Sequence, residues 1–115
     1  MTDAALVPPP DFRQSATALR IARGVRRHLW SLGLSSLCEL PLRNGRRADV
    51  AALSPRGEVW IVEIKSSVAD FRADSKWPAY RDHCDRLFFA TCPETPADIF
   101  PPDAGLLVAD GFGAE

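Results

Sequence analysis

Two short apolar segments, joined by a tight turn, each carry an acidic residue where a β-strand would bury it. Residues 47–54 contain Asp49, and residues 58–66 contain Glu63 with Lys65 two positions later. Burying a charged group inside an apolar strand is costly unless it meets a partner or a metal ion. These three side chains therefore constrain both the fold and the chemistry of the chain.

The turn between the two segments predicts which residues face each other. The loop 55–57 (Pro-Arg-Gly) suits a type I turn followed by a left-handed glycine, a common three-residue hairpin connection. If the residues flanking this loop pair, Asp49 lies opposite Glu63, with Cβ atoms about 5 Å apart. Lys65 lies on the same face because strand side chains alternate with a period of two. The sequence thus predicts that all three groups converge.

Two carboxylates at one sheet edge are typical of a divalent-metal site for phosphate chemistry. Mg²⁺ prefers oxygen ligands and keeps several waters, so Asp49, Glu63 and the carbonyl of Ile64 could hold Mg²⁺ or Mn²⁺. The cation would polarise a phosphate and lower the pKa of a bound water. Lys65 could orient or deprotonate the attacking water, or stabilise negative charge on the phosphorus centre. Glu39, on the preceding predicted strand, is a further candidate catalytic acid.

A structural alternative explains the same charges without a metal. In this interpretation Asp49 with Arg47, and Glu63 with Lys65, form ion pairs on an edge strand.

The remaining pattern predicts an α/β fold. Ser15 can cap a first helix and Gly33 can end it. The expected elements are a helix over 15–32, strands over 36–42, 47–54 and 58–66, a helix from 66 or 67 that Pro78 breaks, a helical stretch over 78–84, a turn over 97–100, and strands over 86–91 and 105–109. The order α-β-β-β-α-β-β predicts a mixed sheet flanked by helices. Residues 1–14 are expected to be a loose N-terminal arm before a single domain over 15–115.

The first helix has two distinct faces. Its expected core stripe is Ala18, Ala22, Val25, Leu29 and Leu32. Arginines lie on another face and recur through the first half of the chain, at positions 13, 20, 23, 26, 27, 43, 46 and 47. The net charge is only −1, so the chain as a whole lacks the excess of positive charge that is typical of many nucleic-acid-binding proteins. The arginines are either a solvated helix face or a phosphate-contacting patch.

Composition narrows the class of protein further. The chain of 115 residues, 46% hydrophobic and 25% charged, has the content of one soluble globular domain. It has no apolar run of the roughly 20 residues that cross a bilayer, and no signal peptide pattern, so we expect a cytoplasmic protein without membrane contact. The three cysteines form no paired motif, which argues against a disulfide framework.

The charged pattern resembles a known superfamily. Asp49, Glu63 and Lys65 match the signature of PD-(D/E)XK nucleases, in which an Asp on one strand precedes an acid-x-Lys on the next. The chain more closely resembles the MmcB-type DNA repair proteins of bacteria. The matching segments are Gly45–Asp49, Trp60–Ser67, Asp70–Asp74, Lys76–Trp77, Tyr80–Asp82 and Cys84–Ala90.

This resemblance implies a restriction-endonuclease-like fold, DNA as partner and a place in the bacterial cytoplasm or nucleoid. Members of the family continue past the turn at 111–113, which implies a C-terminally truncated chain. The candidate DNA-contacting residues are Arg46, Arg47, Ser66, Lys76, Trp77 and Tyr80. Lys76 could contact phosphate, and Trp77 and Tyr80 could stack on an unpaired base. Aromatic residues three positions apart more often pack in the core, and we favour that interpretation for Trp77 and Tyr80. Ser66 could also cap a helix.

Three hypotheses for function follow. The first is a DNA repair protein with a metal-dependent endonuclease site that hydrolyses phosphodiester bonds. The second is a non-catalytic DNA-binding module on the same fold. The third is a protein-interaction subunit, whose partner would be a second copy of the chain or another repair protein.

Overall fold

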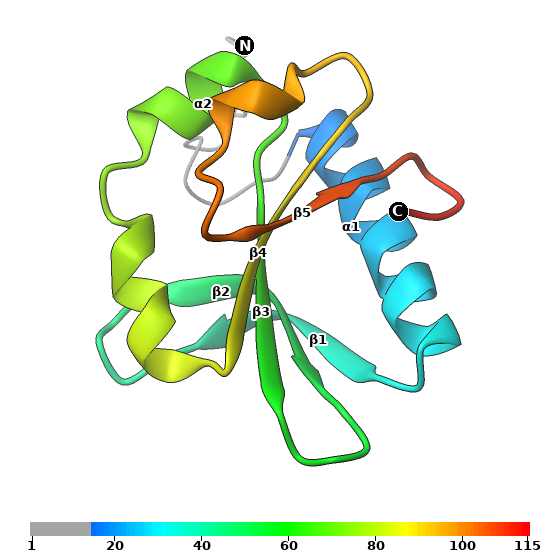
Figure 1. Ribbon diagram of the computed structural model, residues 1–115, viewed down its shortest axis with the longest axis vertical. Coiled ribbons are helices and arrows are strands. Elements are labelled where there is room, and N and C mark those ends of the chain that lie inside the picture. Colours follow the sequence, from blue (N-terminus) through cyan, green and yellow to red (C-terminus); the bar gives the residue numbers. More distant parts are fainter. Residues whose placement is uncertain (1–14) are drawn as a thin grey trace, which may run out of the picture.

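One five-stranded mixed sheet with helices on both faces makes up the structure (Figure 1). The computed structural model describes residues 15–115, so the expected arm at 1–14 and Arg13 lie outside the described residues. The elements are α1 (Ala16–Ser31), β1 (Ser35–Pro41), β2 (Arg47–Leu53), β3 (Val59–Ile64), α2 (Val68–Ala73), the 3₁₀ helix η3 (Trp77–His83), β4 (Arg86–Thr91), the 3₁₀ turn η4 (Ala97–Ile99) and β5 (Gly105–Val108).

The strands follow each other across the sheet in chain order, β1-β2-β3-β4-β5. The first three are antiparallel neighbours, and β3, β4 and β5 run parallel. The predicted α-β-β-β-α-β-β order in a mixed sheet flanked by helices is therefore confirmed. Among the described residues no helix is long and apolar enough to span a membrane, and all three cysteines are free thiols.

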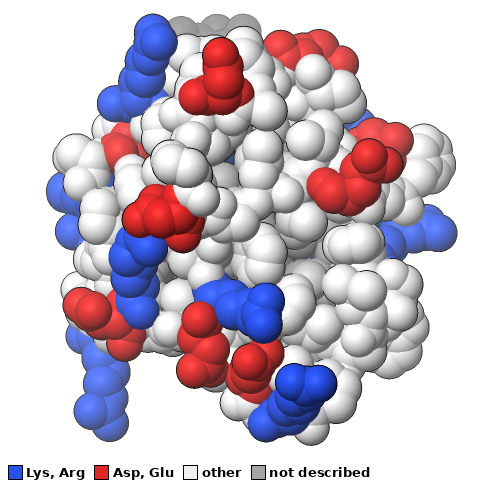
Figure 2. Space-filling model, in the orientation of Figure 1, with Lys and Arg blue, Asp and Glu red and all other residues white. Residues whose placement is uncertain are grey.

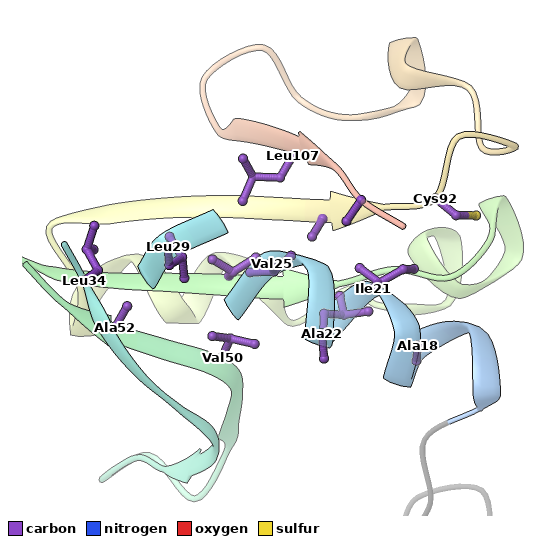
Figure 3. Packing of buried hydrophobic residues seen from close by; sticks show 14 residues of the cluster. Ala18, Ile21, Ala22, Val25, Leu29, Leu34, Val50, Ala52, Cys92 and Leu107 are labelled. Carbon is purple, nitrogen blue, oxygen red and sulfur yellow. The ribbon is translucent and has the colours of Figure 1, made fainter. Parts of the chain in front are cut away.

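Helix α1 covers one face of the sheet. Its side chains Ile21, Val25 and Leu29 point at the sheet and are almost completely buried (Figure 3). The Ser15 side chain accepts a hydrogen bond from the Ala18 N–H at 3.0 Å, as the predicted cap requires. The buried stripe differs from the expected one at two positions. Leu32 follows the last helical turn and is exposed, whereas Ile21, which the expected stripe did not include, belongs to the core.

The opposite face is covered by η3 and α2 (Figure 1). Tyr80 packs there with Ala48 and Ile61, and Trp77 meets the ring of Phe89 edge-on at 5.1 Å. The helix before η3 is shorter than expected. It ends at Ala73 rather than near Pro78, because Asp74 is extended and its side chain accepts the Lys76 N–H at 2.8 Å.

The hairpin between β2 and β3 has the predicted register. Val50 pairs with Val62 and Leu53 with Val59, and the Ser54 N–H donates to the Glu58 carbonyl at 2.9 Å. Gly57 has a φ of 84°, the left-handed conformation that this loop needs. Continued by one residue, this register places Asp49 opposite Glu63, directly after the last paired residues of the two strands.

Candidate functional site

Beyond the Val50–Val62 pair, side-chain carboxylates instead of backbone carbonyls accept the hydrogen bonds between β2 and β3. The Asp49 N–H donates to Glu63 Oε2 at 3.0 Å. The Ile64 N–H donates to Asp49 Oδ2 at 2.8 Å. Each acid is thus held by the backbone of the opposite strand, and the predicted juxtaposition of Asp49 and Glu63 is found. Both lie on the side that η3 covers. Glu63 alternates with Val62 and Ile64 of the α1 face. Burial raises the pKa of Tyr80 in η3, and the charges of Glu63 and Asp49 both help to raise it.

One oxygen of each carboxylate remains for a ligand. Asp49 Oδ1 and Glu63 Oε1 accept no hydrogen bond from the described residues. The N–H and C=O of a strand residue point to the same side, so the carbonyl of Ile64 faces β2 like its N–H. The two free carboxylate oxygens and this carbonyl thus belong to the adjoining ends of β2 and β3.

This donor set fits a hard cation that retains water. No three His, Cys, Asp or Glu side chains within residues 15–115 are grouped to hold an ion. Mg²⁺ commonly binds through one or two carboxylates and completes its shell with waters and substrate phosphates. The donors Asp49, Glu63 and the Ile64 carbonyl fit Mg²⁺ or Mn²⁺ better than zinc, which favours thiolates and imidazoles.

The electrostatics of the two acids favour an added positive charge. Glu63 is 3% exposed, and burial, reinforced by the charge of Asp49, raises its pKa to about 8. Burial also raises the pKa of Asp49 to about 6, although the Ile64 N–H opposes the change. Without a cation near them, both carboxyl groups therefore hold their protons to a higher pH than usual. A divalent ion between the two oxygens would favour both ionised forms.

Lys65 is buried next to this pair and bonded to a residue that the sequence did not indicate. Its Nζ lies 2.7 Å from Asp74 Oδ2, and the Lys65 side chain is 8% exposed. Burial opposes ionisation of Asp74, but hydrogen bonds from Lys65 and the Lys76 N–H outweigh it and lower the pKa of Asp74. A buried lysine needs a counter-ion, and that need was the signal that could have pointed to an acid on the following helix.

The structure contradicts the ion pairs of the structural alternative. Arg47 approaches Glu39, not Asp49, at 3.9 Å, and both side chains are half exposed. Lys65 binds Asp74, not Glu63.

Glu39 lies near the site without joining its hydrogen bonds. The register of β1 and β2, with Cys38 opposite Val50 and Leu40 opposite Ala48, places Glu39 across from Asp49. Its φ of 56° interrupts the regular strand. The charge of Glu39 contributes to the raised pKa of Asp49, so it is close enough to influence the site.

The candidate DNA-contacting residues divide into two groups. Tyr80 is 8% exposed and its hydroxyl donates to the Arg47 carbonyl at 2.9 Å. Trp77 packs on Phe89 under the Arg81 guanidinium, 5.2 Å from its ring centre. This placement favours packing over base stacking for both aromatic residues.

The polar candidates differ from one another in exposure. The Ser66 N–H and hydroxyl donate to Asp70 Oδ2, which ties Ser66 to the start of α2. Arg47 and Lys76 are exposed, and Arg46 is partly exposed. These basic side chains remain available for phosphate.

Comparison with known proteins gives a family and a structural relative. A family model described as "DNA repair protein MmcB-like" matches residues 6–115. Among solved structures, the chain is similar to the SPO1766 protein of unknown function from Silicibacter pomeroyi, with 48% identity and a TM-score of 0.83 over 90% of this chain and 70% of that one. A search of curated proteins gave no match.

Proposed function

Because the chain belongs to the MmcB-like DNA repair protein family, we propose that it hydrolyses phosphodiester bonds in DNA with a divalent cation bound by Asp49 and Glu63. The supporting observation is the reciprocal bonding of the two acids across β2 and β3, which fixes both carboxylates and leaves Oδ1 of Asp49 and Oε1 of Glu63 for the cation. This arrangement is the one expected of PD-(D/E)XK nucleases.

The chemistry divides between the cation and the protein. A bound Mg²⁺ or Mn²⁺ supplies Lewis acidity toward a phosphate oxygen and a more acidic water. Asp49, Glu63 and the Ile64 carbonyl would hold and orient the ion. Glu39, opposite Asp49, adds negative charge that favours cation binding.

Lys65 has the role of an electrostatic stabiliser. Its ammonium is ion-paired with Asp74 at 2.7 Å, and an ammonium has no lone pair with which to take a proton from water. Held next to Glu63, it can instead compensate the negative charge that develops as the phosphorus centre is attacked. The ion pair therefore favours charge stabilisation over general-base catalysis.

DNA would reach this site through basic side chains at its rim. Arg46, Arg47 and Lys76 are the candidates that the fold leaves accessible, and they would position the phosphates without reading sequence.

The proposal is tested by DNA cleavage with matched variants. Supercoiled plasmid and oligonucleotides should be nicked in Mg²⁺ or Mn²⁺ but not in EDTA. Glu63→Gln and Lys65→Met should each reduce the rate at least about 100-fold. Asp82→Asn, which removes an exposed acid outside the site, should retain the wild-type rate. Cleavage that survives both site variants would refute the proposal.

A second candidate function is DNA binding without cleavage. It is favoured by the raised pKa values of Asp49 and Glu63, because protonated acids repel phosphate less than carboxylates do. It predicts salt-sensitive DNA binding with no cleavage at any concentration of Mg²⁺ or Mn²⁺.

A further inference from the structure

The outer side of α1 carries a stripe of exposed residues that the core does not use. Leu19, Arg23, Arg26, Arg27 and Trp30 follow each other at spacings that place them on one side of a helix. All five are exposed, Trp30 to 74% and Leu19 to 57%. Together with the first half of β1, they line a groove of about 860 Å³. We call it the α1–β1 groove.

The α1–β1 groove is cationic. Among the described residues that line it are three arginines and one acidic residue, Glu39, which already approaches Arg47. The sequence of α1 contains no Asp or Glu. On the face that Figure 2 draws, acidic and basic side chains are interspersed. A groove lined by several arginines favours a polyanion as its occupant.

Arg26 binds the edge strand β1, and this contact disfavours a β-strand as the occupant of the groove. Its Nε donates to Ser36 Oγ at 3.0 Å and its Nη2 to the Ser36 carbonyl at 3.2 Å. Because β1 is the edge of the sheet, this contact covers a backbone carbonyl to which an added strand would pair, and so disfavours strand addition. Arg23 and Arg27 make no hydrogen bond or ion pair with other described residues, so both are available to a ligand.

Trp30 indicates which polyanion fits. An indole exposed at the end of a row of arginines is a platform on which an unpaired base can stack, while guanidinium groups bind the phosphates. A duplex keeps its bases stacked on each other and offers no base face to Trp30. We propose that the α1–β1 groove binds single-stranded nucleic acid, with phosphates on Arg23 and Arg27 and a base on Trp30.

This binding can be measured apart from the proposed hydrolysis, although Glu39 lines the groove and also lies opposite Asp49. The groove lies on the α1 side of the sheet, whereas Asp49 and Glu63 belong to the side that η3 covers. It uses neither carboxylate and no metal ion, so it can be measured in EDTA, where the proposed cleavage cannot occur.

The test is fluorescence anisotropy with the full chain in EDTA. The probes are labelled oligonucleotides of about 16 nucleotides, the upper site size of comparable single-strand binders, as single-stranded DNA, single-stranded RNA and duplex DNA. We expect at least one single strand to bind about tenfold more tightly than the duplex. Trp30→Ala should weaken that binding about tenfold, and Trp30→Phe should retain most of it.

The arginines are tested against a charge-matched control. Arg23→Ala/Arg27→Ala should reduce the salt slope of log K by about 1.4, the value for two lost single-strand phosphate contacts. Arg56→Ala, an exposed arginine in the β2–β3 turn, should leave the slope nearly unchanged. All substituted side chains are exposed, so thermal unfolding should match the wild type.

Two outcomes would overturn the inference. One is that duplex DNA binds as tightly as the single-stranded DNA probe and the single-stranded RNA probe. The other is Trp30→Ala and Arg23→Ala/Arg27→Ala proteins that bind like Arg56→Ala. Absence of cleavage in Mg²⁺ would refute the proposed hydrolysis and leave this result unaffected.

Discussion

The ammonium of Lys65 lies 2.7 Å from the carboxylate of Asp74. Lys65 is buried beside the two acids that face each other across β2 and β3, and Asp74 is partly exposed. Asp74 follows α2 directly, and its other oxygen accepts the Lys76 N–H. The turn that ends α2 therefore fixes the position of the lysine.

The first prediction concerns the stability that this ion pair contributes. Asp74→Ala should lower the free energy of unfolding by about 3 kcal/mol, because it leaves the buried Lys65 ammonium without a partner. Urea unfolding measures the loss. Asp103→Ala is a suitable control, since Asp103 pairs with Arg81 at a similar 3.0 Å but in solvent, and should cost less than about 1 kcal/mol. Equal losses in the two variants would contradict the assigned burial.

The second prediction concerns pH. The folded protein holds the Glu63 proton up to about pH 8, whereas in the unfolded chain Glu63 releases it near its ordinary pKa of 4.5. Between these values the folded state binds more protons, so the stability of the metal-free protein should fall as pH rises and level off above about pH 8.

Glu63→Gln removes this titration. In EDTA at pH 8 the variant should melt several degrees above the wild type, since about 1 kcal/mol corresponds to about 4–8 °C in a domain of this size. At pH 4.5 the two melting temperatures should agree. A variant that melts below the wild type at both pH values would show that Glu63 stabilises the fold as a carboxylate.

The third prediction concerns the contact between α1 and the turn at 110–113. A Cβ at Gly24 would overlap the Asp110 carbonyl oxygen and lie 2.6 Å from that of Gly113. Gly→Ala inside a helix normally stabilises by about 1 kcal/mol, but here the added methyl group meets backbone. Gly24→Ala should therefore destabilise the protein in thermal unfolding, and a stabilised variant would contradict this close approach.

Local patterns were sufficient to predict the hairpin and its acids. The loop 55–57 fixes its own geometry, and strand alternation then determines which side chains of β2 and β3 share a face. The same local signals predicted the Ser15 cap and the mixed sheet.

Features that depend on contacts between distant residues were missed. The pairing of Lys65 with Asp74 depends on where α2 ends, and that end is set by an Asp74 side chain bonding to backbone, not by Pro78. The burial of Tyr80, by contrast, was the favoured interpretation, but its hydrogen bond to the Arg47 carbonyl, 33 residues away in sequence, was not foreseen. No periodicity in the sequence carries this information.

The most direct test of the central claim is a titration of the protein with Mn²⁺ at pH 7.5, in which free Mn²⁺ is measured by its electron paramagnetic resonance. We predict one binding site in the wild type and none of comparable affinity in Asp49→Asn/Glu63→Gln, with Asp82→Asn as the charge-loss control that keeps the site. A double variant that binds one Mn²⁺ as tightly as the wild type would contradict the assignment of Asp49 and Glu63 as the cation ligands.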